Sequence, residues 1–382
     1  MSRGQGTGDG AQITPSRGQT PVPGPLSPVP SSYDVLVLGG GTAGLVTASG
    51  CARLGRRVAL IERAALGGDC LWTGCVPTKS LVASAKLLHQ MRNAGAFGLE
   101  PQQPRVSPRA IMESMRERRR VISVHDDPEK FRKLGIDVIE GSVTFVDAGT
   151  VDVGGRRLTA KDIVIATGSR TAVPPVEGLG EHGYLDHATF LDRDDFPSSL
   201  VILGGGPIGI EFAQMFRRFG CGVVVVEMLD EIINKEDADV VAAVRAILRE
   251  EGIEIRTGWG AKSVRVENGK KVVRIETKSG EAAELRADEI FVASGRRGNT
   301  EGFEKAGLKM NKSYVAVDKY LQTSVPRVWA CGDVHGGLQF THVAAYEAVK
   351  LVRNLLFPGK SAVSYEHVPW ALYTDPEVGH IG

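Results

Sequence analysis

The chain has 382 residues, which is enough for two or three domains that each bury a core. Its 46 basic and 45 acidic side chains leave a net charge of +1, so electrostatics gives no reason to expect nucleic acid or a membrane as a partner. No apolar run approaches the ~20 residues that span a bilayer, and five cysteines are too sparse for a secreted disulfide scaffold, so we expect a cytoplasmic protein.

Residues 1–32 are rich in Gly, Pro, Ser and Gln and hold almost no large apolar side chains. Such a segment cannot bury enough apolar surface to offset the entropy that it loses on ordering, so we expect a disordered tail. It lacks the apolar stretch of a secretory signal. A transit peptide is the remaining alternative, but two arginines without an amphipathic period argue against it.

The folded part opens with a pattern that is typical of a dinucleotide-binding βαβ unit. It has a short apolar strand, a glycine-rich turn, a helix of small residues and a second strand that ends in an acid: residues 35–38, Gly39, Gly41, Gly44, residues 58–61 and Glu62. The glycines let backbone N–H groups approach a pyrophosphate, and the acid accepts hydrogen bonds from ribose hydroxyls. A glycine-rich turn in another α/β fold is the alternative, but the spacing of all the parts favours a dinucleotide site.

Two cysteines stand close together in the stretch LGGDCLWTGCVPTKSL, residues 66–81, just before a predicted helix. They could be a metal pair, a chance pair or a redox couple. A metal site usually needs four ligands, and no second cysteine or histidine pair has a suitable spacing. Cys75 precedes Pro77, which suits the first turn of a helix, and a helix N-terminus lowers the pKa of a thiol. A redox couple of Cys70 and Cys75 is therefore favoured. Cysteines in apolar surroundings are expected in the core, namely Cys51, Cys221 and Cys331.

Residues 109–135 form a long charged segment that predicts one exposed helix. Its basic run is expected to be a solvated face rather than a nucleic-acid patch. The first unit then closes with an apolar strand that ends in IVIATGS, residues 163–169, and delivers Gly168 into a turn where a ligand can come close.

The βαβ pattern recurs further along the chain. Its parts are residues 201–203, Gly204, Gly206, Gly209, residues 223–226 and Glu227. The strand in EIFVASGRRGN, residues 289–299, closes this second unit and delivers Gly295 into a turn. A later strand in TSVPRVWACGDV, residues 323–334, ends in Gly332-Asp333, where an acid can bind a ligand hydroxyl. Two units predict two dinucleotides, and one chain that binds both most simply relays electrons between them.

With these motifs in place, the chain from residue 33 onward resembles the pyridine nucleotide-disulfide oxidoreductase family, the group of dihydrolipoamide dehydrogenase, glutathione reductase and mercuric reductase. The block GGDCLWTGCVPTK resembles that family's redox-active signature, a glycine pair, C-x-x-x-x-C and then V-P-x-K. The resemblance implies an α/β fold with two Rossmann-like domains of the glutathione reductase type, the NAD domain being inserted in the FAD domain. FAD would bind the first unit and NAD(P)H the second.

The resemblance also implies the domain boundaries. They are a tail (1–32), an FAD-binding domain in two parts (33–180, with the redox disulfide, and 300–366), an NAD(P)-binding domain between them (181–299), and the start of a truncated interface domain (367–382).

Residue roles follow from the same resemblance. Cys75 would face the flavin, Cys70 would attack the substrate, and Lys79 near the flavin would pair with Glu211. The FAD site would be completed by Glu62 on the adenosine ribose, Asp333 on the ribityl chain, and the turns at Thr167, Gly168 and Gly332. No residue is expected to bind a metal, and structural roles are favoured for His335 and His342.

Glu227 predicts a preference for NAD(H) over NADP(H), because a carboxylate accepts from a free 2′-hydroxyl and repels a 2′-phosphate. The following residues, MLDEIIN, include no Arg or Lys that could bind such a phosphate. This choice differs from that of glutathione and mercuric reductases.

The resemblance implies a further interface domain that makes a homodimer and supplies an acid–base histidine. Residues 373–382 resemble only its first strand, and His380 in that strand does not match the catalytic histidine. We therefore expect weak dimerisation and no positioned acid within this chain.

The expected function is an oxidoreductase in which electrons pass from NADH to FAD, then to the Cys70–Cys75 disulfide, and then to an acceptor. The acceptor would be a small-molecule or protein disulfide, as in dihydrolipoamide dehydrogenase, or a soft metal ion, as in mercuric reductase. The alternative is a truncated FAD/NAD-binding flavoprotein with only diaphorase-type activity.

Overall fold

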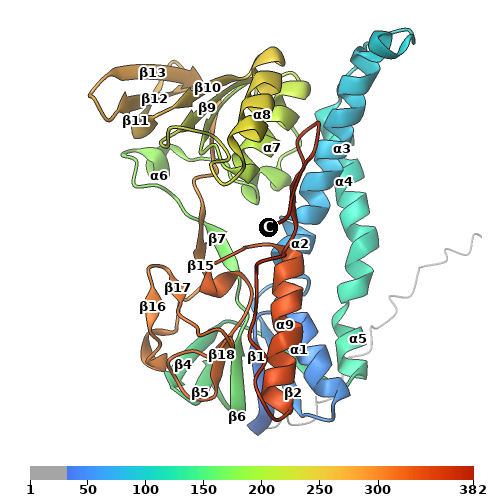
Figure 1. The fold of residues 1–382 in the computed structure, drawn as a ribbon, viewed down its shortest axis with the longest axis vertical. Helices are drawn as coiled ribbons and strands as arrows, with labels where there is room; N and C mark the ends of the chain where they lie inside the picture. Colours follow the sequence, from blue (N-terminus) through green and yellow to red (C-terminus); the bar gives the residue numbers. More distant parts are fainter. Residues whose placement is uncertain (1–31) are drawn as a thin grey trace, which may run out of the picture. The chain divides into compact units, whose positions relative to one another are not determined.

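The computed structural model describes residues 32–382, so the tail expected at residues 1–32 lies outside the described residues except for Ser32. Within this described part, no helix is long and apolar enough to cross a membrane. The elements group around two mainly parallel sheets, one formed by the first βαβ unit and one by the second (Figure 1).

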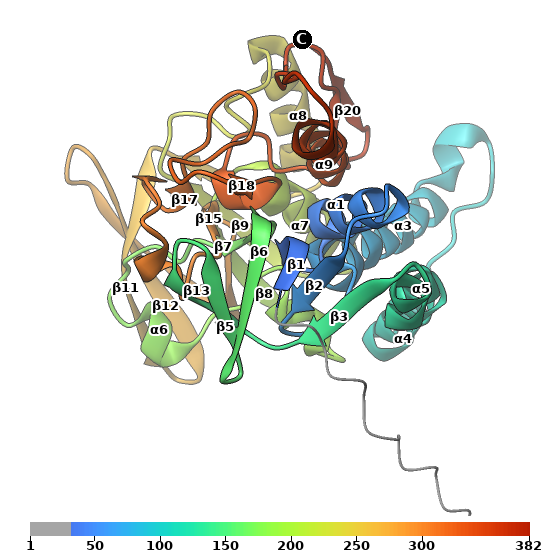
Figure 2. The same ribbon diagram turned by 90° about the horizontal axis from the view of Figure 1, so that it is seen from below.

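The first sheet has the strand order β3-β2-β1-β6-β5-β4, with β18 also paired to β6. Its strands are β1 (Ser32–Leu38), β2 (Val58–Glu62), β3 (Ile136–Glu140), β4 (Val143–Asp147), β5 (Thr150–Val153), β6 (Arg156–Ile165) and β18 (Val328–Ala330). The row from β3 to β6 is visible from below in Figure 2. Leu36, Val37 and Leu38 are all fully buried, as expected for a central parallel strand that is covered on both faces.

The late strand β18 lies parallel to the C-terminal half of β6, with Val328 opposite Ile163 and Ala330 opposite Ile165. The chain thus returns to the first sheet after it has built the second. The return brings the Gly332-Asp333 turn to the same sheet edge as the turn at Thr167, because the carboxyl ends of parallel strands share one edge.

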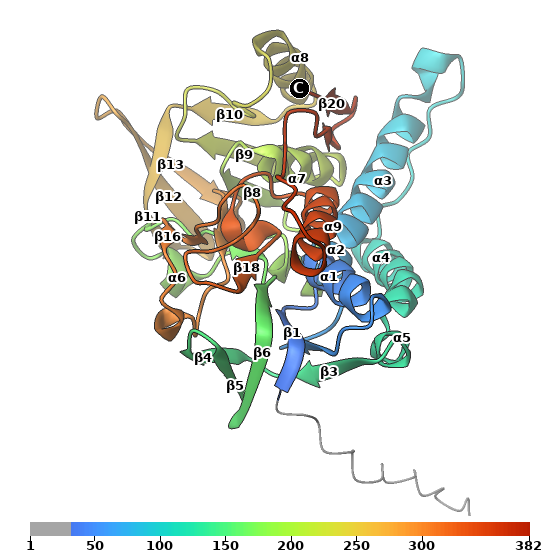
Figure 3. The ribbon, with the colours of Figure 1, turned by 60° about the horizontal axis from the view of Figure 1, so that its bottom comes forward.

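Helices α1 (Thr42–Arg53) and α9 (Thr341–Leu356) lie side by side over the first sheet (Figure 3). Their apolar residues, including Ala48 and Leu351, share one core with β1 and β2. The two helices approach closely at Gly50, where a Cβ would lie 3.0 Å from Val352. This contact places the N-terminus of α9 beside the first glycine-rich turn.

The second sheet is parallel, in the order β10-β9-β8-β14, and an antiparallel meander of three strands follows it in the chain. The sheet strands are β8 (Ser199–Leu203), β9 (Gly222–Glu227), β10 (Glu254–Thr257) and β14 (Glu289–Val292), with helices α7 (Pro207–Arg218) and α8 (Ala238–Glu250). The meander strands are β11 (Trp259–Glu267), β12 (Lys270–Thr277) and β13 (Ala282–Ala287).

Two short strands connect the sheets. β7 (Ser169–Thr171) leaves the first unit, β15 (Arg296–Gly298) returns from the second, and the two pair antiparallel (Figure 1). The remaining short elements are η1 (Ala94–Phe97), α6 (Leu179–His182), η3 (Thr189–Asp192), η4 (Glu304–Ala306), β16 (Met310–Asn311), β17 (Tyr314–Val315), η5 (Asp333–His335), β19 (Trp370–Leu372) and β20 (Val378–His380).

The redox block folds into a short helix, α2 (Gly68–Trp72), followed by the long helix α3 (Cys75–Arg92). Cys75 is therefore the first residue of α3, as the position of Pro77 predicted. The glycine-bounded turn between the two helices is what brings Cys70 and Cys75 together.

The single helix predicted over residues 109–135 is wrong. The structure has α4 (Pro108–Ser123), η2 (Val124–Asp126) and α5 (Pro128–Lys133). Pro128 ends the helical run of α4 and η2 because a residue before proline is driven out of the helical region, and Asp127 is extended with φ −60° and ψ 126°. The Asp127 carboxylate then caps α5 by accepting from Glu129 N at 2.8 Å.

Candidate functional site

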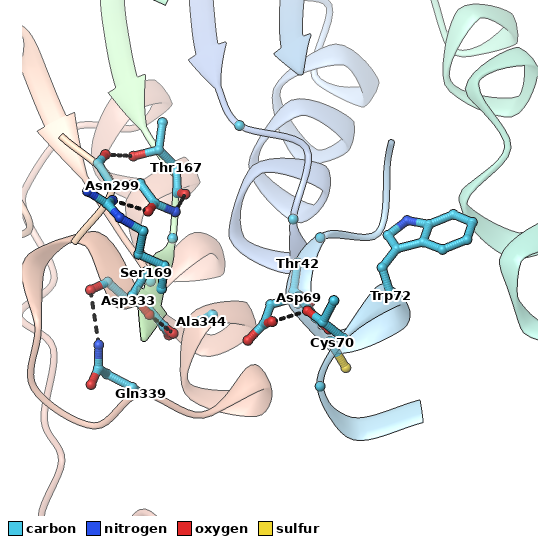
Figure 4. A pocket seen from close by; sticks show the side chains of 18 of the residues that line it. Thr42, Asp69, Cys70, Trp72, Thr167, Ser169, Asn299, Asp333, Gln339 and Ala344 are labelled. Carbon is cyan, nitrogen blue, oxygen red and sulfur yellow. Dashed lines mark hydrogen bonds between the residues drawn. The ribbon is translucent and has the colours of Figure 1, made fainter. Parts of the chain in front are cut away.

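One cavity of about 850 Å³ connects most of the residues that the sequence singled out. It begins at Glu62, passes the first glycine-rich turn and the two thiols, and reaches Glu211 at the start of α7. Figure 4 shows part of its wall, with Asp333 and Gln339 on one side and Asp69 and Cys70 on the other.

The first glycine-rich turn is shaped by close backbone contacts. Gly39 has φ +110°, and a Cβ on it would lie 2.7 Å from the carbonyl carbon of Ala166. A Cβ on Gly44 would collide with the carbonyl oxygen of Gly39. Gly41 lies against Gly68, whose Cβ would fall 2.6 Å from the Gly41 Cα. Only glycine fits at Gly39, Gly44 and Gly68, and the cavity wall at this turn is bare backbone that a pyrophosphate can approach.

Glu62 lies at one end of the cavity and braces this turn. Its carboxylate accepts from Gly40 N at 2.6 Å and from Ala64 N at 2.9 Å. Since a carboxylate has about four acceptor positions, it can still bind ribose hydroxyls.

Thr167 and Gly168 lie in the turn after β6, as predicted. Thr167 Oγ1 donates to Asn299 O at 2.6 Å, and Asn299 Nδ2 donates back to Thr167 O at 2.8 Å. Gly168 adopts φ +69°, which glycine tolerates best. The two hydrogen bonds between Thr167 and Asn299 therefore join the turn before β7 to the turn after β15.

Asp333 projects into the middle of the cavity from the turn after β18. It accepts from Ser169 Oγ at 2.7 Å, and burial raises its pKa even though Arg296 and Ser169 act against this. Gly332 precedes it with φ +73°, and its N–H donates to the fully buried Glu347 at 2.7 Å. The hydrogen bond to Glu347 thus fixes the turn on its buried side, while Asp333 lines the cavity.

The thiols of Cys70 and Cys75 are both free in this structure. Cys75 Sγ lies 3.5 Å from the hydroxyl of Thr341, the first residue of α9. The hydrogen bond from Cys70 lowers the pKa of Cys75 to about 6 against the opposing effect of burial, with help from Thr341 and the charge of Lys79. The same bond and burial raise the pKa of Cys70.

Lys79 lies one turn beyond Cys75 on α3 and pairs with Glu211 of α7. The distance from Nζ to Oε2 is 2.6 Å, and the Glu211 side chain is only 7% exposed. Tyr373 secures both partners, because its N–H donates to Glu211 Oε1 at 2.9 Å and its ring centre lies 4.6 Å from Lys79 Nζ. The geometry therefore contains the ion pair that the resemblance implied.

The second glycine-rich turn repeats the first. A Cβ on Gly204 would lie 2.6 Å from the carbonyl carbon of Ala293, and Gly209 packs against the Gly204 carbonyl oxygen. Glu227 accepts from Gly205 N at 2.6 Å and from Leu229 N at 2.8 Å, as Glu62 does in the first unit. Gly206 has open space around it, and Gly295 adopts φ +120°. The second turn therefore offers the same kind of backbone wall as the first, although its glycines do not line the cavity described above.

Several cavity residues were not singled out by the sequence. They are Asp69, Ser169, His187, Arg296, Asn299, Thr341 and Tyr373. Asp69 and Asn299 stand within motifs that were noted, so their proximity to the site was available as a signal. Thr341 and Tyr373 meet Cys75 and Lys79 only through the fold, and no local pattern marks them.

The three cysteines expected in the core are buried, whereas the two histidines favoured for structural roles differ in their surroundings. The His335 side chain is 7% exposed and lies 2.9 Å from Glu347 Oε2, whereas His342 lines the cavity and lies 2.8 Å from Pro369 O. Cys51, Cys221 and Cys331 are at most 2% exposed, and burial raises the pKa of each. Across residues 32–382, no group of three or more His, Cys, Asp or Glu side chains could hold a metal ion.

Two glycine-walled cradles and a thiol pair between them define a nucleotide-dependent redox protein. The sequence matches the family model described as pyridine nucleotide-disulphide oxidoreductase over residues 33–348. The dihydrolipoyl dehydrogenase of Bacillus subtilis (strain 168) is 34% identical over 357 residues, covering 91% of this chain and 76% of that protein. The mercuric reductase of Staphylococcus aureus is 32% identical, with coverage of 92% and 64%.

Solved structures agree with the sequence relatives. The HOCl-induced flavoprotein disulfide reductase RclA from Escherichia coli, solved as a Cu(II) complex, matches with a TM-score of 0.80 and 30% identity over 92% of this chain and 77% of that one. The chain therefore belongs to the pyridine nucleotide-disulphide oxidoreductase family. It is an FAD-dependent enzyme of that family, which confirms the predicted fold class and reaction type and does not favour the diaphorase alternative.

Proposed function

We propose that the chain uses NADH to reduce the Cys70–Cys75 disulfide and that the dithiol then reduces an acceptor disulfide. Bound FAD would supply the hydride and electron transfer between the nucleotide and the sulfur atoms. The observation that carries this proposal is the geometry of the two thiols. Cys70 and Cys75 line the same cavity as Lys79, and Cys75 begins α3 with its sulfur 3.5 Å from Thr341 Oγ1.

Cys75 acts as the thiolate that faces the flavin. The bond from Cys70, the Thr341 hydroxyl and the starts of α3 and α9 all stabilise its negative charge. Lys79 adds a positive charge, and Glu211 keeps that lysine in place. A thiolate that is stable at neutral pH suits electron exchange.

Cys70 acts as the interchange thiol. The Cys70 sulfur attacks one sulfur of the acceptor, whose S–S bond breaks as a mixed disulfide forms, and the Cys70 proton passes to the first acceptor sulfur, which leaves as a thiol. The Cys75 thiolate then attacks Cys70 Sγ, which forms the Cys70–Cys75 bond and releases the second acceptor sulfur as a thiolate that takes its proton from water. The acceptor gains two electrons and the dithiol loses two.

The FAD roles are assigned to the residues that wall the cavity. Gly39, Gly41 and Gly44 would approach the pyrophosphate, Glu62 would bind the adenosine ribose, and Asp333 the ribityl chain. The turns at Thr167, Gly168 and Gly332 would contact the remainder. The support is that all of these residues except Gly44 line one continuous cavity, and that Gly44 packs directly beneath the turn against the Gly39 carbonyl.

The NAD roles are assigned to Gly204, Gly206, Gly209, Gly295 and Glu227. NADH is preferred because both Glu227 oxygens are held by backbone N–H groups, which fixes the carboxylate where a 2′-phosphate would have to sit. The repeat of the Glu62 geometry supports a ribose-binding role.

A metal ion is the second candidate acceptor. It is supported by the mercuric reductases among the relatives and by the Cu(II) complex of RclA. A disulfide is preferred because, in the described part of the chain, no group of three or more His, Cys, Asp or Glu side chains is placed to hold a metal ion. A homodimer and a cytoplasmic location, both expected from the sequence, stay predictions.

Anaerobic titration with NADH tests the proposal. The reduced enzyme should show the long-wavelength absorbance of a thiolate against oxidised flavin. Cys75→Ser should abolish that band, whereas Cys70→Ser should show it without any reductant. Turnover should then be compared with lipoamide and with Hg(II). If neither variant differs from the parent, the redox-couple assignment is wrong.

A further inference from the structure

A cluster of charged and polar side chains lines the cavity beside the thiols but has no part in the chemistry proposed above. Its members come from four separate segments of the chain, namely α2, β7, the loop before η3, and β15. They are Asp69, Ser169, Thr171, His187 and Arg296.

Arg296 is the centre of this cluster. Its Nη2 donates to Asp69 Oδ2 at 2.7 Å, and its Nε donates to Ser169 Oγ at 2.7 Å. Ser169 Oγ in turn donates to Asp333 Oδ2. Only 11% of the Arg296 side chain is exposed, so its charge depends on Asp69 and Asp333, whose Oδ2 lies 3.7 Å from Arg296 Nε.

Asp69 has further charged and polar neighbours. His187 Nε2 lies 3.2 Å from its Oδ1, and the Thr73 hydroxyl bonds the same oxygen. Burial raises the pKa of Asp69, but the His187 hydrogen bond and the Arg296 charge outweigh it and hold the pKa well below its usual range. Asp69 is therefore a permanent anion next to Cys70.

Asp69 connects the cluster to the turn that carries the two thiols. Its carbonyl oxygen accepts from Thr73 N at 2.9 Å and from Gly74 N, so it shapes the turn that carries Cys70 to Cys75. Its carboxylate reaches β15, which pairs with β7, and these are the two strands that connect the nucleotide units. One side chain thus joins the redox turn to both connections.

We propose that Asp69 and Arg296 are positioning residues, a clamp that holds the Cys70–Cys75 turn against β7 and β15 and aligns it with Asp333 across the flavin cavity. The proposal rests on the proposed function, because it assigns the clamp to the site where thiols and flavin meet. The clamp has two separable effects. It fixes the geometry of the cavity wall, and it neutralises the Asp69 charge that otherwise acts on both thiols.

The electrostatic effect has a sign that a structural role alone does not predict. Asp69 raises the pKa of Cys75, whereas Cys70, Thr341 and Lys79 lower it. Asp69→Asn removes the anion and should lower the pH midpoint of Cys75 ionisation. Arg296→Gln leaves the anion without its guanidinium partner and should raise that midpoint. General loosening of the loop would move both variants in one direction.

The experiment uses the purified FAD-loaded chain, reduced and then alkylated with iodoacetamide across pH 4.5–9. Peptide mass spectrometry follows Cys75, and FAD release is measured separately by its fluorescence. We expect midpoints shifted by about 0.5 pH unit, downward for Asp69→Asn and upward for Arg296→Gln. Each variant should also bind FAD about tenfold more weakly, and the double variant little worse than either single one.

Controls separate the clamp from general damage. Asp194→Asn breaks a comparable ion pair, Arg116–Asp194 at 2.6 Å, and should change neither readout. Arg296→Lys keeps the positive charge but cannot bond Asp69 and Ser169 at once as the guanidinium does. Its Cys75 midpoint should therefore match the parent, whereas its FAD binding should stay as weak as in Arg296→Gln. If Arg296→Gln does not fold, this lysine variant and Asp69→Asn still test the pair.

Equal-direction midpoint shifts in Asp69→Asn and Arg296→Gln, or FAD release as slow as in the parent, would overturn the clamp. Neither readout requires turnover. A chain that shows no NADH-dependent thiol formation would instead contradict the proposed function, whatever the midpoints of the variants.

Discussion

Cys75 Sγ lies 3.5 Å from Thr341 Oγ1, although 266 positions separate the two residues in the chain. The contact exists because α3 begins at Cys75 and α9 begins at Thr341, so two helix N-termini meet at one sulfur atom. Each N-terminus carries a partial positive charge that favours an anion. The thiolate site is therefore assembled by the packing of two helices rather than by the cysteine motif alone.

Replacement of Thr341 should make Cys75 harder to ionise. Since the Thr341 hydroxyl lowers the pKa of Cys75, Thr341→Val should move the alkylation midpoint upward from about 6, by roughly 0.5–1 pH unit. Below that midpoint Cys75 is protonated and reacts slowly, and above it the thiolate reacts. Thr341→Ser keeps the hydroxyl and should match the parent. Identical midpoints for the valine and serine variants would show that the hydroxyl has no role.

The Lys79–Glu211 pair should act on the same midpoint and on stability. Lys79→Met removes a charge that lowers the pKa of Cys75, so the midpoint should rise. It also leaves the buried Glu211 without its cation, which should lower the free energy of unfolding in urea by about 1–3 kcal/mol. The cost is smaller than for a fully buried pair because Lys79 is partly exposed to solvent.

Lys86→Met is a suitable control for that variant. Lys86 lies on the same helix, and its longer contacts of 3.4 and 3.6 Å reach Asp375 and Glu377. It should leave the Cys75 midpoint unchanged and cost less than 1 kcal/mol. A midpoint that stays at the parent value in Lys79→Met would contradict the assigned electrostatic role.

The sequence predicted the parts of this site that are local. A strand, a glycine turn and an acid such as Glu62 form within about thirty residues, and the backbone contacts of Gly39 and Gly44 follow from that motif. The family resemblance supplied Lys79 and Glu211. Arg296 and Tyr373 stand within segments that the sequence singled out, but their contacts with Asp69 and Lys79 could not be read locally, because the fold brings these segments together. Thr341 lies in no such segment. The break at Pro128 is a local signal, because the residue before a proline disfavours the helical region.

The glycines of the first turn should differ in what they tolerate. A Cβ on Gly44 would collide with backbone, so Gly44→Ala should destabilise the FAD-free protein by about 1–3 kcal/mol as well as weaken FAD binding. A Cβ on Gly41 would lie 3.7 Å from Gly68, an ordinary contact. Gly41→Ala should therefore leave thermal unfolding of the FAD-free protein nearly unchanged and weaken FAD binding alone. Equal effects of the two variants on unfolding would argue against the backbone-contact explanation.

The two acids that end β2 and β9 offer a matched test of nucleotide assignment. Glu62 and Glu227 hold equivalent backbone N–H groups, at 2.6 Å from Gly40 and from Gly205. Glu227→Gln removes the charge while keeping an acceptor for the turn. It should reduce the preference for NADH over NADPH in dye reduction by roughly tenfold, since a carboxylate facing a phosphate costs more than an amide does.

Glu62→Gln makes the same change in the first unit and serves as the control. It should weaken FAD binding, because the ribose loses a charged acceptor, and leave the NADH-to-NADPH ratio of the FAD-saturated enzyme unchanged. The ratio must be measured at saturating FAD, so that loss of the flavin does not appear as loss of nucleotide selectivity. If Glu62→Gln alters the ratio and Glu227→Gln does not, the two units have been assigned to the wrong nucleotides. If neither alters it, the preference lies in residues other than these acids.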